Sequence, residues 1–375
     1  MAMTVVLVAS LAESVSNFRA PLVRELVARG IRVIAVAPDL DDKSRAAIRA
    51  LGAESALVPF ARTGMNPFAD ARGIFALYRF FRQHRPQAVL AYTAKPVNYG
   101  LLAARFAGVP VRAAMITGLG YAFTEGQEPR RRVARFAAGA LYRCSLPQAT
   151  SLIFQNPDDV ALFRSVGILR GSSPVNLVNG SGVECGHYAS TALPGVPHFL
   201  MVARLLKDKG VREYAEAARQ LRRAVPHAIT SLAGWIDSSP DAVTQAELSA
   251  WQADGLNFLG RLSDVRPAIS QASVVVLPSY REGTPRSVLE GMAMGRAIIT
   301  TDAPGCRETV VHGVNGLLVP PRDAGALARA MTELAGDPAR VAAMGRESRR
   351  IAEEKYDAKA VALDTLRKAG ILPAP

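Results

Sequence analysis

The stretch SVVVLPSYREGTPRSVLEGMAMGRAIITTD, residues 273–302, decides the fold prediction. It begins with a short apolar run, continues through a loop that contains Gly and Pro, and ends in a second apolar run. Between the runs, residues 286–295 have Leu289, Met292 and Met294 as possible core-facing positions, which predicts a short helix. A strand, a helix and a further strand in this order indicate an α/β fold with a parallel sheet.

The same alternation of short apolar runs and helix-length segments extends over the whole chain, as expected of parallel sheets covered on both faces. In the first half, strands are predicted at residues 4–10, 31–38, 87–93, 111–117 and 151–156, and helices at 17–30 and 97–108. In the second half, strands are predicted at 198–204, 227–234, 256–260, 273–279, 297–302 and 315–320.

The domain organisation follows from length and from one segment of unusual composition. A chain of 375 residues is long enough for two ordinary cores. Residues 178–197 are rich in Gly, Ser and Pro and lack periodicity, which indicates a hinge. We therefore predict two doubly wound Rossmann-like domains, residues 1–185 and 195–355, with a ligand cleft between them, followed by a helical segment at 356–375 that returns to the first domain.

Composition limits the classes of binding partner and indicates the cellular compartment. The net charge is +13, and most of the basic excess lies in the N-terminal half. Charge alone fits a nucleic acid, an anionic membrane surface or a phosphorylated ligand. No apolar run reaches the roughly 18 residues of a membrane-spanning helix, and the N-terminal residues lack the basic region of a signal peptide. The expected location is the cytoplasm.

Two acids in the opening stretch suggest a ligand. Glu282 lies in the loop, and Glu290 lies eight positions later in the predicted helix, for which Thr284 is the expected N-cap and Pro285 the first residue. The N-terminus of a helix attracts an anion such as a diphosphate, and two carboxylates can accept hydrogen bonds from hydroxyls on either side of it. Taken singly, each acid fits an ordinary surface charge better.

The segments 278–320 and VARLLKDKGV (202–211) resemble glycosyltransferase family 4, the retaining, nucleotide-sugar-dependent enzymes of GT-B fold. The resemblance implies that Arg204 and Lys209 hold the donor diphosphate. Both residues lie at or just after the carboxyl end of the strand predicted at 198–204, from which their side chains could reach a phosphate group. It further implies that Glu290 binds the ribose and Glu282 the donor sugar. Residues near the sugar and phosphates would be Gly283, Thr284 and Pro285.

The N-terminal half resembles a subgroup of this family that extends saccharides on polyprenyl-diphosphate carriers, among them N-acetylgalactosaminyltransferases. The similar segments are ARTGMNP, AYTAKPVNYG and MITGLGYAFTEG. The residues expected to meet the acceptor or lipid headgroups are Arg62, Lys95, Thr117, Gly118 and Arg131, with Arg130, Arg132 and Arg135 near the last. The segment 128–144 fits a helix lying on the bilayer and equally an amphipathic helix packed on the sheet.

Two departures from the family pattern concern the donor side. The first strand is not followed by a Gly-rich loop, and Thr117 stands where relatives often carry a histidine. No metal or other cofactor is expected: the acidic residues 39–42 are interpreted as a solvated turn, and the five histidines form no spaced pair.

The resemblance implies a retaining transferase that moves an N-acetylhexosamine or hexose from a UDP-sugar to a polyprenyl-diphosphate-linked saccharide in bacterial glycan or polysaccharide assembly. Expected partners are the nucleotide sugar, the lipid-linked acceptor and an anionic membrane surface, without nucleic acid, at the inner face of the plasma membrane. The alternatives are a sugar-nucleotide 2-epimerase of the same fold, a transferase that uses a soluble acceptor or GDP-mannose, and a non-catalytic binding module.

Overall fold

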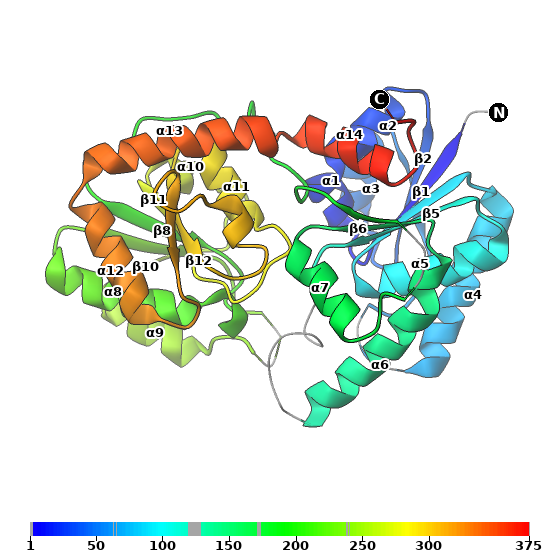
Figure 1. The fold of residues 1–375 in the computed structure, drawn as a ribbon, viewed down its shortest axis with the longest axis horizontal. Helices are drawn as coiled ribbons and strands as arrows, with labels where there is room; N and C mark the ends of the chain where they lie inside the picture. The colour runs from blue at the N-terminus through cyan, green and yellow to red at the C-terminus, as the bar shows by residue number, and fades with distance from the viewer. Residues whose placement is uncertain are drawn as a thin grey trace. The chain divides into compact units, whose positions relative to one another are not determined.

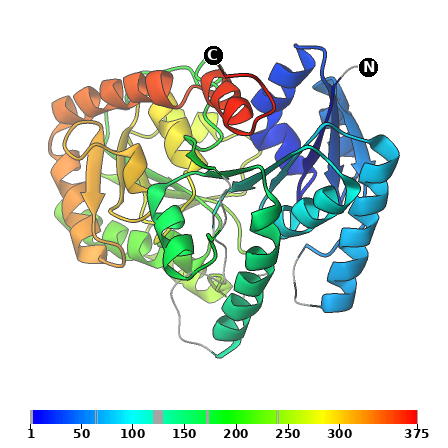
Figure 2. The ribbon, with the colours of Figure 1, turned by 45° about the vertical axis from the view of Figure 1, so that its right-hand side comes forward.

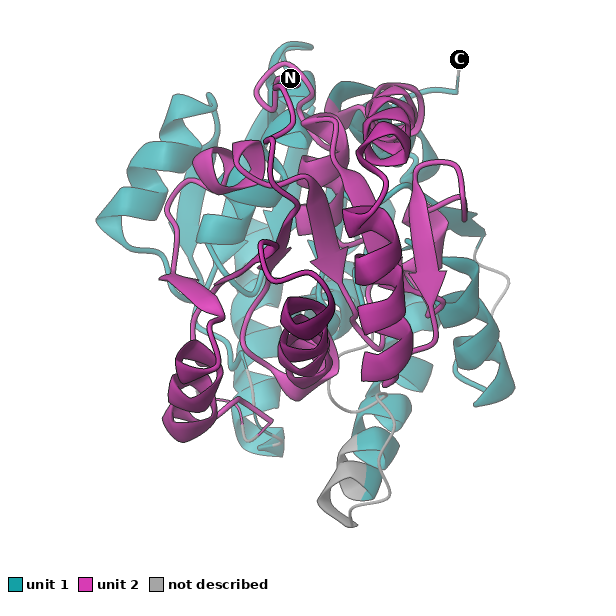
Figure 3. Ribbon diagram, turned by 90° about the vertical axis from the view of Figure 1, so that its left-hand side faces the viewer, with its two compact units in different colours: residues 1–181, 359–375 teal, residues 182–358 magenta. Residues whose placement is uncertain are grey.

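The computed structural model divides into two compact units, drawn in separate colours in Figure 3. Unit 1 comprises residues 1–181 and 359–375, and unit 2 comprises residues 182–358. Each unit is built on one parallel sheet, so the predicted pair of doubly wound Rossmann-like domains is confirmed. The structure describes residues 3–62, 64, 66–118, 129–170, 174–237, 239 and 241–374, without the side chains of 129–131, 133 and 134.

Unit 1 contains a seven-stranded sheet in the order β3-β2-β1-β4-β5-β6-β7, with every neighbouring pair parallel. The direction of the strand order reverses between β1 and β4, which is the switch point of the sheet. The strands are β1 (Thr4–Val8), β2 (Arg32–Ala37), β3 (Glu54–Leu57), β4 (Ala88–Tyr92), β5 (Val111–Ile116), β6 (Ser151–Phe154) and β7 (Val175–Leu177).

Helices cover both faces of this sheet because its inner strands are apolar on both sides. In β1, Val6 and Val8 face the cluster under α4 to α7, while Val5 and Leu7 face the cluster under α1 to α3 and α14. The helices can be followed in Figures 1 and 2. They are α1 (Glu13–Phe18), α2 (Ala20–Val27), α3 (Asp42–Ala50), α4 (Pro67–His84), α5 (Ala94–Ala107), α6 (Pro129–Ser145), η2 (Leu146–Gln148), α7 (Pro157–Ser165) and α14 (Ala358–Lys368).

The C-terminal helix α14 packs on unit 1. Leu366 is fully buried in the cluster beneath α1 to α3. Its neighbour Lys368 accepts a hydrogen bond from Ser151 Oγ at 2.6 Å through its carbonyl, and its Nζ donates to the carbonyl of Leu177 at 2.7 Å. These contacts tie the end of the chain to β6 and β7.

Unit 2 contains a six-stranded parallel sheet in the order β10-β9-β8-β11-β12-β13. All six strands predicted for this half are present, and the order reverses between β8 and β11. The strands are β8 (His198–Val202), β9 (Ile229–Ala233), β10 (Asn257–Gly260), β11 (Val274–Leu277), β12 (Ala297–Thr301) and β13 (Gly316–Val319). The helices are η3 (Lys207–Lys209), α8 (Val211–Ala224), α9 (Gln245–Ala253), α10 (Arg266–Ser270), α11 (Arg286–Ala293), η4 (Arg307–Thr309), α12 (Ala324–Ala335) and α13 (Pro338–Lys355).

Two details of unit 1 differ from the sequence prediction. The short strands β3 and β7 were not predicted, and each mixes exposed and half-buried residues instead of forming an apolar run. The predicted helix at 17–30 is two helices that meet at Arg19, whose φ of −113° and ψ of 4° are not helical. Pro21 in the first turn of α2 has no N–H to continue the first helix, which explains the division.

Candidate donor site at the switch point of unit 2

The predicted donor residues follow β8 and β11, the two strands between which the order of the sheet reverses. These strands pair in parallel, with Val274 opposite Phe199, so their carboxyl ends lie at the same edge. In open α/β sheets, ligands bind outside the carboxyl ends of the strands at such a switch point. Topology therefore places this loop cluster where a ligand is expected.

Lys209 is held in place by the close approach of two loops. Gly210, which follows it, has a φ of 72°, and a Cβ atom there would lie 2.1 Å from the carbonyl oxygen of Pro278. Only glycine allows the segment after β8 to lie so near the end of β11. The carbonyl of Asp208 accepts hydrogen bonds from Ser279 Oγ at 3.0 Å and from the Tyr280 N–H at 2.9 Å.

Lys209 and Glu282 form an ion pair in which both side chains are largely buried. The structure therefore brings together the residues predicted to contact the diphosphate and the donor sugar. Glu282 is fixed through its backbone, because its N–H donates to the carbonyl of Pro304 at 2.9 Å. Gly305 follows Pro304 in the sequence, and a Cβ atom on Gly305 would lie 2.1 Å from the carbonyl oxygen of Glu282.

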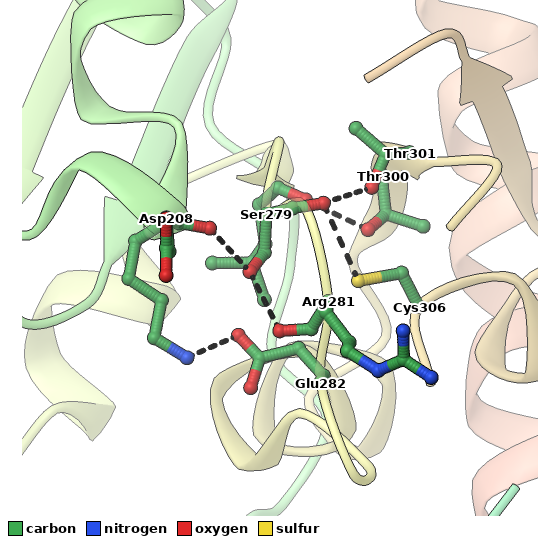
Figure 4. A network of polar contacts seen from close by, with 9 residues as sticks. Asp208, Ser279, Arg281, Glu282, Thr300, Thr301 and Cys306 are labelled. Atoms are coloured by element: carbon green, nitrogen blue, oxygen red, sulfur yellow. Dashed lines mark hydrogen bonds and ion pairs between the residues drawn. The ribbon is translucent and has the colours of Figure 1, made fainter. Parts of the chain in front are cut away.

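A network of polar contacts holds the loop that carries Glu282, as Figure 4 shows. The carbonyl oxygen of Ser279 accepts hydrogen bonds from Thr301 Oγ1 and, at 3.8 Å, from Cys306 Sγ. The single hydroxyl proton of Ser279 is shared between the carbonyl of Asp208 at 3.0 Å and that of Arg281 at 3.2 Å. Burial raises the pKa of Cys306 to about 12, so its thiol keeps the proton that it donates.

Glu290 is buried in α11, with only 8% of its surface exposed. The interpretation of this residue as an exposed helical acid is therefore wrong. Its Oε1 accepts hydrogen bonds from Tyr188 Oη at 2.8 Å and from Arg286 Nε at 3.0 Å. Burial and the adjacent Glu290 carboxylate raise the pKa of Tyr188, so the phenol stays protonated and donates. Among the described residues, Oε2 accepts no hydrogen bond.

The start of α11 differs from the prediction. The helix begins at Arg286, and Pro285 occupies the N-cap position without any side-chain cap. The predicted cap at Thr284 is wrong, because Pro285 has an extended ψ of 114° and lies outside the helix. Gly283, Thr284 and Pro285 thus form a short link between the ion pair and the helix that carries Glu290.

Arg204 lies just beyond β8 and is about half exposed. Its Nη1 pairs with Asp237 Oδ2 at 3.1 Å, and Asp237 follows β9, the next strand of the sheet. Among the described residues, Arg204 makes no ion pair with the other predicted site acids. The structure thus places its charge at the same sheet edge as Lys209, held by a different carboxylate.

The residues predicted for the acceptor follow successive strands of unit 1. Lys95 pairs with Asp70 at 2.9 Å, and Arg62 pairs with Asp39 at 3.4 Å. Thr117 and Gly118 come directly after β5, and Gly118 has a φ of 141°. The ion pairs of Lys95 and Arg62 are separate, each with its own carboxylate. The side chain of Arg131 lies outside the described residues.

Two further predictions for unit 1 concern the acidic segment 39–42 and the segment 128–144. Asp41, in the acidic segment interpreted as a solvated turn, caps α3 by accepting from the Ser44 N–H at 2.8 Å. The segment around 128–144 is helical as α6, and Tyr142 packs in the core while Phe136 is 76% exposed. The helix therefore both packs on the sheet and presents apolar surface.

Sequence reasoning missed Tyr188, Arg286 and Asp237. Tyr188 lies in the segment that composition marked as a hinge, and no local pattern connects it with an acid about a hundred positions away. Arg286 stands four residues before Glu290, a spacing at which helical side chains meet, so this partner was accessible to prediction.

Two searches of the described part of the chain gave negative results. No group of three or more His, Cys, Asp or Glu residues there lies close enough to hold a metal ion. No helix there combines the length and the apolar character needed to cross a bilayer.

Two doubly wound units, one of which gathers cations and carboxylates at its switch point, define the architecture of the GT-B glycosyltransferases. Comparison of the sequence with protein families leads to the same class of enzyme. The family described as glycosyl transferase 4-like domain matches residues 15–173, and the family described as glycosyl transferases group 1 matches residues 196–337. The chain belongs to these glycosyltransferases.

Individual relatives cover most of the chain. It is 28% identical over 338 residues to the N,N'-diacetylbacillosaminyl-diphospho-undecaprenol alpha-1,3-N-acetylgalactosaminyltransferase of Campylobacter jejuni, with 86% of this chain and 87% of that protein aligned. It is 23% identical to the UDP-Gal:alpha-D-GlcNAc-diphosphoundecaprenol alpha-1,3-galactosyltransferase of Escherichia coli, over 75% and 74% of the two chains. The structure of Anabaena Alr3699/HepE in complex with UDP-glucose superimposes with a TM-score of 0.79 at 16% identity, covering 99% of this chain and all of the other.

Proposed function

We propose that the protein is a retaining glycosyltransferase that moves an N-acetylhexosamine or hexose from a UDP-sugar to a polyprenyl-diphosphate-linked saccharide in bacterial glycan or polysaccharide assembly. The observation that carries the proposal is the Lys209–Glu282 ion pair at the switch point of unit 2, which a three-residue link joins to the helix that carries the buried Glu290. The names of the two sequence relatives, which both specify diphospho-undecaprenol acceptors, support the acceptor class.

In this proposal, unit 2 binds the donor. Arg204 and Lys209 contact the diphosphate, and Lys209 can do so without releasing Glu282 because an ammonium group has three N–H donors. Oε2 of Glu290 accepts hydrogen bonds from the ribose hydroxyls, and Glu282 contacts the donor sugar. Gly283, Thr284 and Pro285 border the sugar and phosphates.

The chemical step is a front-face substitution at the anomeric carbon. The bond from this carbon to the phosphate oxygen breaks while the bond to the acceptor oxygen forms on the same face. The acceptor hydroxyl proton passes to the departing phosphate. Negative charge grows on that phosphate in the transition state, so the fixed cations Arg204 and Lys209 stabilise the transition state more than the bound donor.

We propose that these two cations take the charge-neutralising role and that no metal ion is needed. In this proposal, unit 1 provides the acceptor side through Arg62, Lys95, Thr117, Gly118 and Arg131. The basic N-terminal half would meet anionic headgroups at the inner face of the plasma membrane, where a lipid-linked acceptor resides.

The test is nucleotide release from a panel of UDP- and GDP-sugars, with and without polyprenyl-diphosphate-linked mono- and disaccharides in detergent, in the presence of EDTA. The proposal predicts acceptor-dependent release of UDP from one donor and an α-linked product with retained configuration by NMR. Conversion of UDP-N-acetylglucosamine without acceptor would instead identify an epimerase. Transfer to a soluble saccharide alone, release of GDP, or binding without turnover would each contradict the proposal.

A further inference from the structure

The turn between β4 and α5 in unit 1 consists of a single residue, Thr93. Strand β4 ends at Tyr92, and helix α5 begins at Ala94. Thr93 has a φ of 69° and a ψ of 160°, a combination that is adopted almost only by glycine. For a β-branched residue such a backbone is a genuine outlier, and strained residues of this kind cluster at functional sites.

Neither the backbone nor the helix gains from a threonine at position 93. The turn is tight because α5 packs closely on β4, and a Cβ atom on Gly100 would lie 3.2 Å from Cβ of Ala91. Glycine at position 93 would make the same turn without strain. A threonine that precedes a helix ordinarily caps it by accepting from a backbone N–H, but Thr93 does not cap α5 with its side chain. The presence of this side chain therefore needs an explanation outside the turn.

The Thr93 side chain meets a second hydroxyl group. Thr93 Oγ1 lies 2.6 Å from Ser10 Oγ, and both residues are half-buried. Ser10 follows β1 and Thr93 follows β4, the two strands between which the order of the sheet reverses. A parallel ladder already joins residues 5–8 of β1 to residues 88–91 of β4, so the strands are held together without the hydroxyl pair. The pair lies at the edge of the sheet where a ligand of unit 1 is expected.

We propose that the Ser10–Thr93 hydroxyl pair binds a hydroxyl group of the acceptor saccharide and so contributes to the choice of acceptor. Each of the two hydroxyls can donate one hydrogen bond and accept others. One proton is used within the pair, so the second proton and the unused lone pairs remain for a ligand that both donates and accepts, as a sugar hydroxyl does. A phosphate group suits this pair less well, because it binds most strongly to cationic donors.

The strained turn explains why the hydroxyl of Thr93 is available to a ligand. A sharp, strained turn from a strand into a helix presents the side chain of its central residue at the top of the sheet. Among the described residues, the two hydroxyls bond only to each other, and neither contacts a carboxylate or a histidine that could act as a base. The pair is therefore suited to recognition and not to nucleophilic attack. The inference rests on the proposed function, in which unit 1 provides the acceptor side.

The test is steady-state kinetics of sugar transfer by the full chain in detergent, with the lipid-linked saccharide that the panel of donors and acceptors identifies. Thr93→Val keeps the branched shape and removes the hydroxyl, so KM for the acceptor should rise about fivefold to tenfold, while KM for the UDP-sugar stays within about twofold. Thr93→Ser keeps the hydroxyl and should stay within about twofold of the wild type in both constants. One monodeoxy analogue of the saccharide should raise KM for the wild type by the same factor and have no further effect on Thr93→Val.

A second pair of variants separates the strain from the recognition. Thr93→Gly relieves the backbone and should raise the thermal midpoint by about 2 °C, although it raises KM for the acceptor as much as Thr93→Val does. The matched control is Arg85→Gly, which lies just before the opposite end of β4 and also replaces a residue of positive φ, here 45°. This control should leave both KM values unchanged.

Three results would overturn the inference. They are an acceptor KM that Thr93→Val leaves unchanged, a rise of the donor KM in its place, and a lower thermal midpoint for Thr93→Gly, since the threonine would then serve the fold. If the wild type transferred sugar to none of the lipid-linked saccharides, the proposed function would be contradicted, and this inference with it.

Discussion

The hydroxyl of Tyr188 donates a 2.8 Å hydrogen bond to Oε1 of Glu290. Tyr188 lies near the start of unit 2, and its own carbonyl accepts from Arg349 Nη1 of α13 at 2.8 Å. The same arginine atom donates to the carbonyl of Cys185 at 3.1 Å. The carboxylate proposed to bind ribose is therefore oriented by a segment that α13 holds in place.

From this contact we predict that Tyr188→Phe weakens UDP binding about fivefold, in line with the loss of one hydrogen bond of about 1 kcal/mol. The reason is that Oε1 loses one of its donors and the carboxylate is less well oriented. Calorimetric titration with UDP measures the effect, and KM for the donor should rise more than kcat falls. The control Tyr214→Phe removes another buried hydroxyl, which donates to the carbonyl of Phe199, and should lower stability without changing UDP affinity.

Glu290→Gln should weaken UDP binding more strongly, by about tenfold to a hundredfold, because a hydrogen bond to a charged acceptor contributes about 1.5–3 kcal/mol. The amide keeps the shape of the side chain, so the thermal midpoint reports whether packing survives. An unchanged dissociation constant for UDP would remove Glu290 from the site.

Lys209→Met should lower kcat about 10²- to 10³-fold, as expected when one preorganised group that stabilises transition-state charge is removed. The matched control is Lys207→Met, two residues away in the same short helix and exposed to solvent. Measured transfer rates at saturating donor distinguish the two. Similar rates for both variants would contradict the role given to Lys209.

Gly305→Ala should disturb the loop that carries Glu282, because the new Cβ would lie 2.1 Å from the Glu282 carbonyl oxygen. Gly313→Ala is the control: its φ of 79° is almost the same as the 80° of Gly305, but no atom lies within 4 Å of the added Cβ. Both variants pay about 1–2 kcal/mol for the left-handed backbone. Only Gly305→Ala should also lose transfer activity, and equal activity of the two variants would show that the close approach is irrelevant.

The Arg212–Glu247 pair gives a prediction for acid stability. The hydrogen bonds from Arg212 and Thr244 lower the pKa of Glu247 from its ordinary 4.5 to about 2. A lowered folded-state pKa adds stability above the unfolded value, and this stability is lost as pH falls from about 4.5 to 2. Because the pair is about one-third exposed, we expect Glu247→Gln to cost about 1 kcal/mol at pH 7 and to flatten the decline in that window, measured by urea unfolding.

Much of the fold was accessible from the sequence because buried parallel strands are continuous apolar runs. All six strands of unit 2 were predicted in this way, and β1, β2, β4, β5 and β6 of unit 1 as well. The strands that escaped prediction, β3 and β7, lie at the two edges of their sheet and are only partly buried, so their composition resembles a loop.

The resemblance predicted the individual residues of the candidate site. It did not predict the contacts between them. The Lys209–Glu282 pair joins positions 73 apart, and it depends on a Gly210 backbone that contacts Pro278. The buried Glu290 accepts a hydrogen bond from Tyr188, 102 positions away. Such partners come from the topology of the sheet, which a local pattern does not contain.

The most direct test of the central claim is transfer of radiolabelled sugar from a UDP-sugar to a polyprenyl-diphosphate-linked saccharide, measured in the organic extract for wild type and Glu282→Ala side by side. Our account predicts a labelled lipid product with the wild type, and none with Glu282→Ala although this variant still binds UDP. Equal labelling by both proteins would show that transfer takes place without the site described in unit 2.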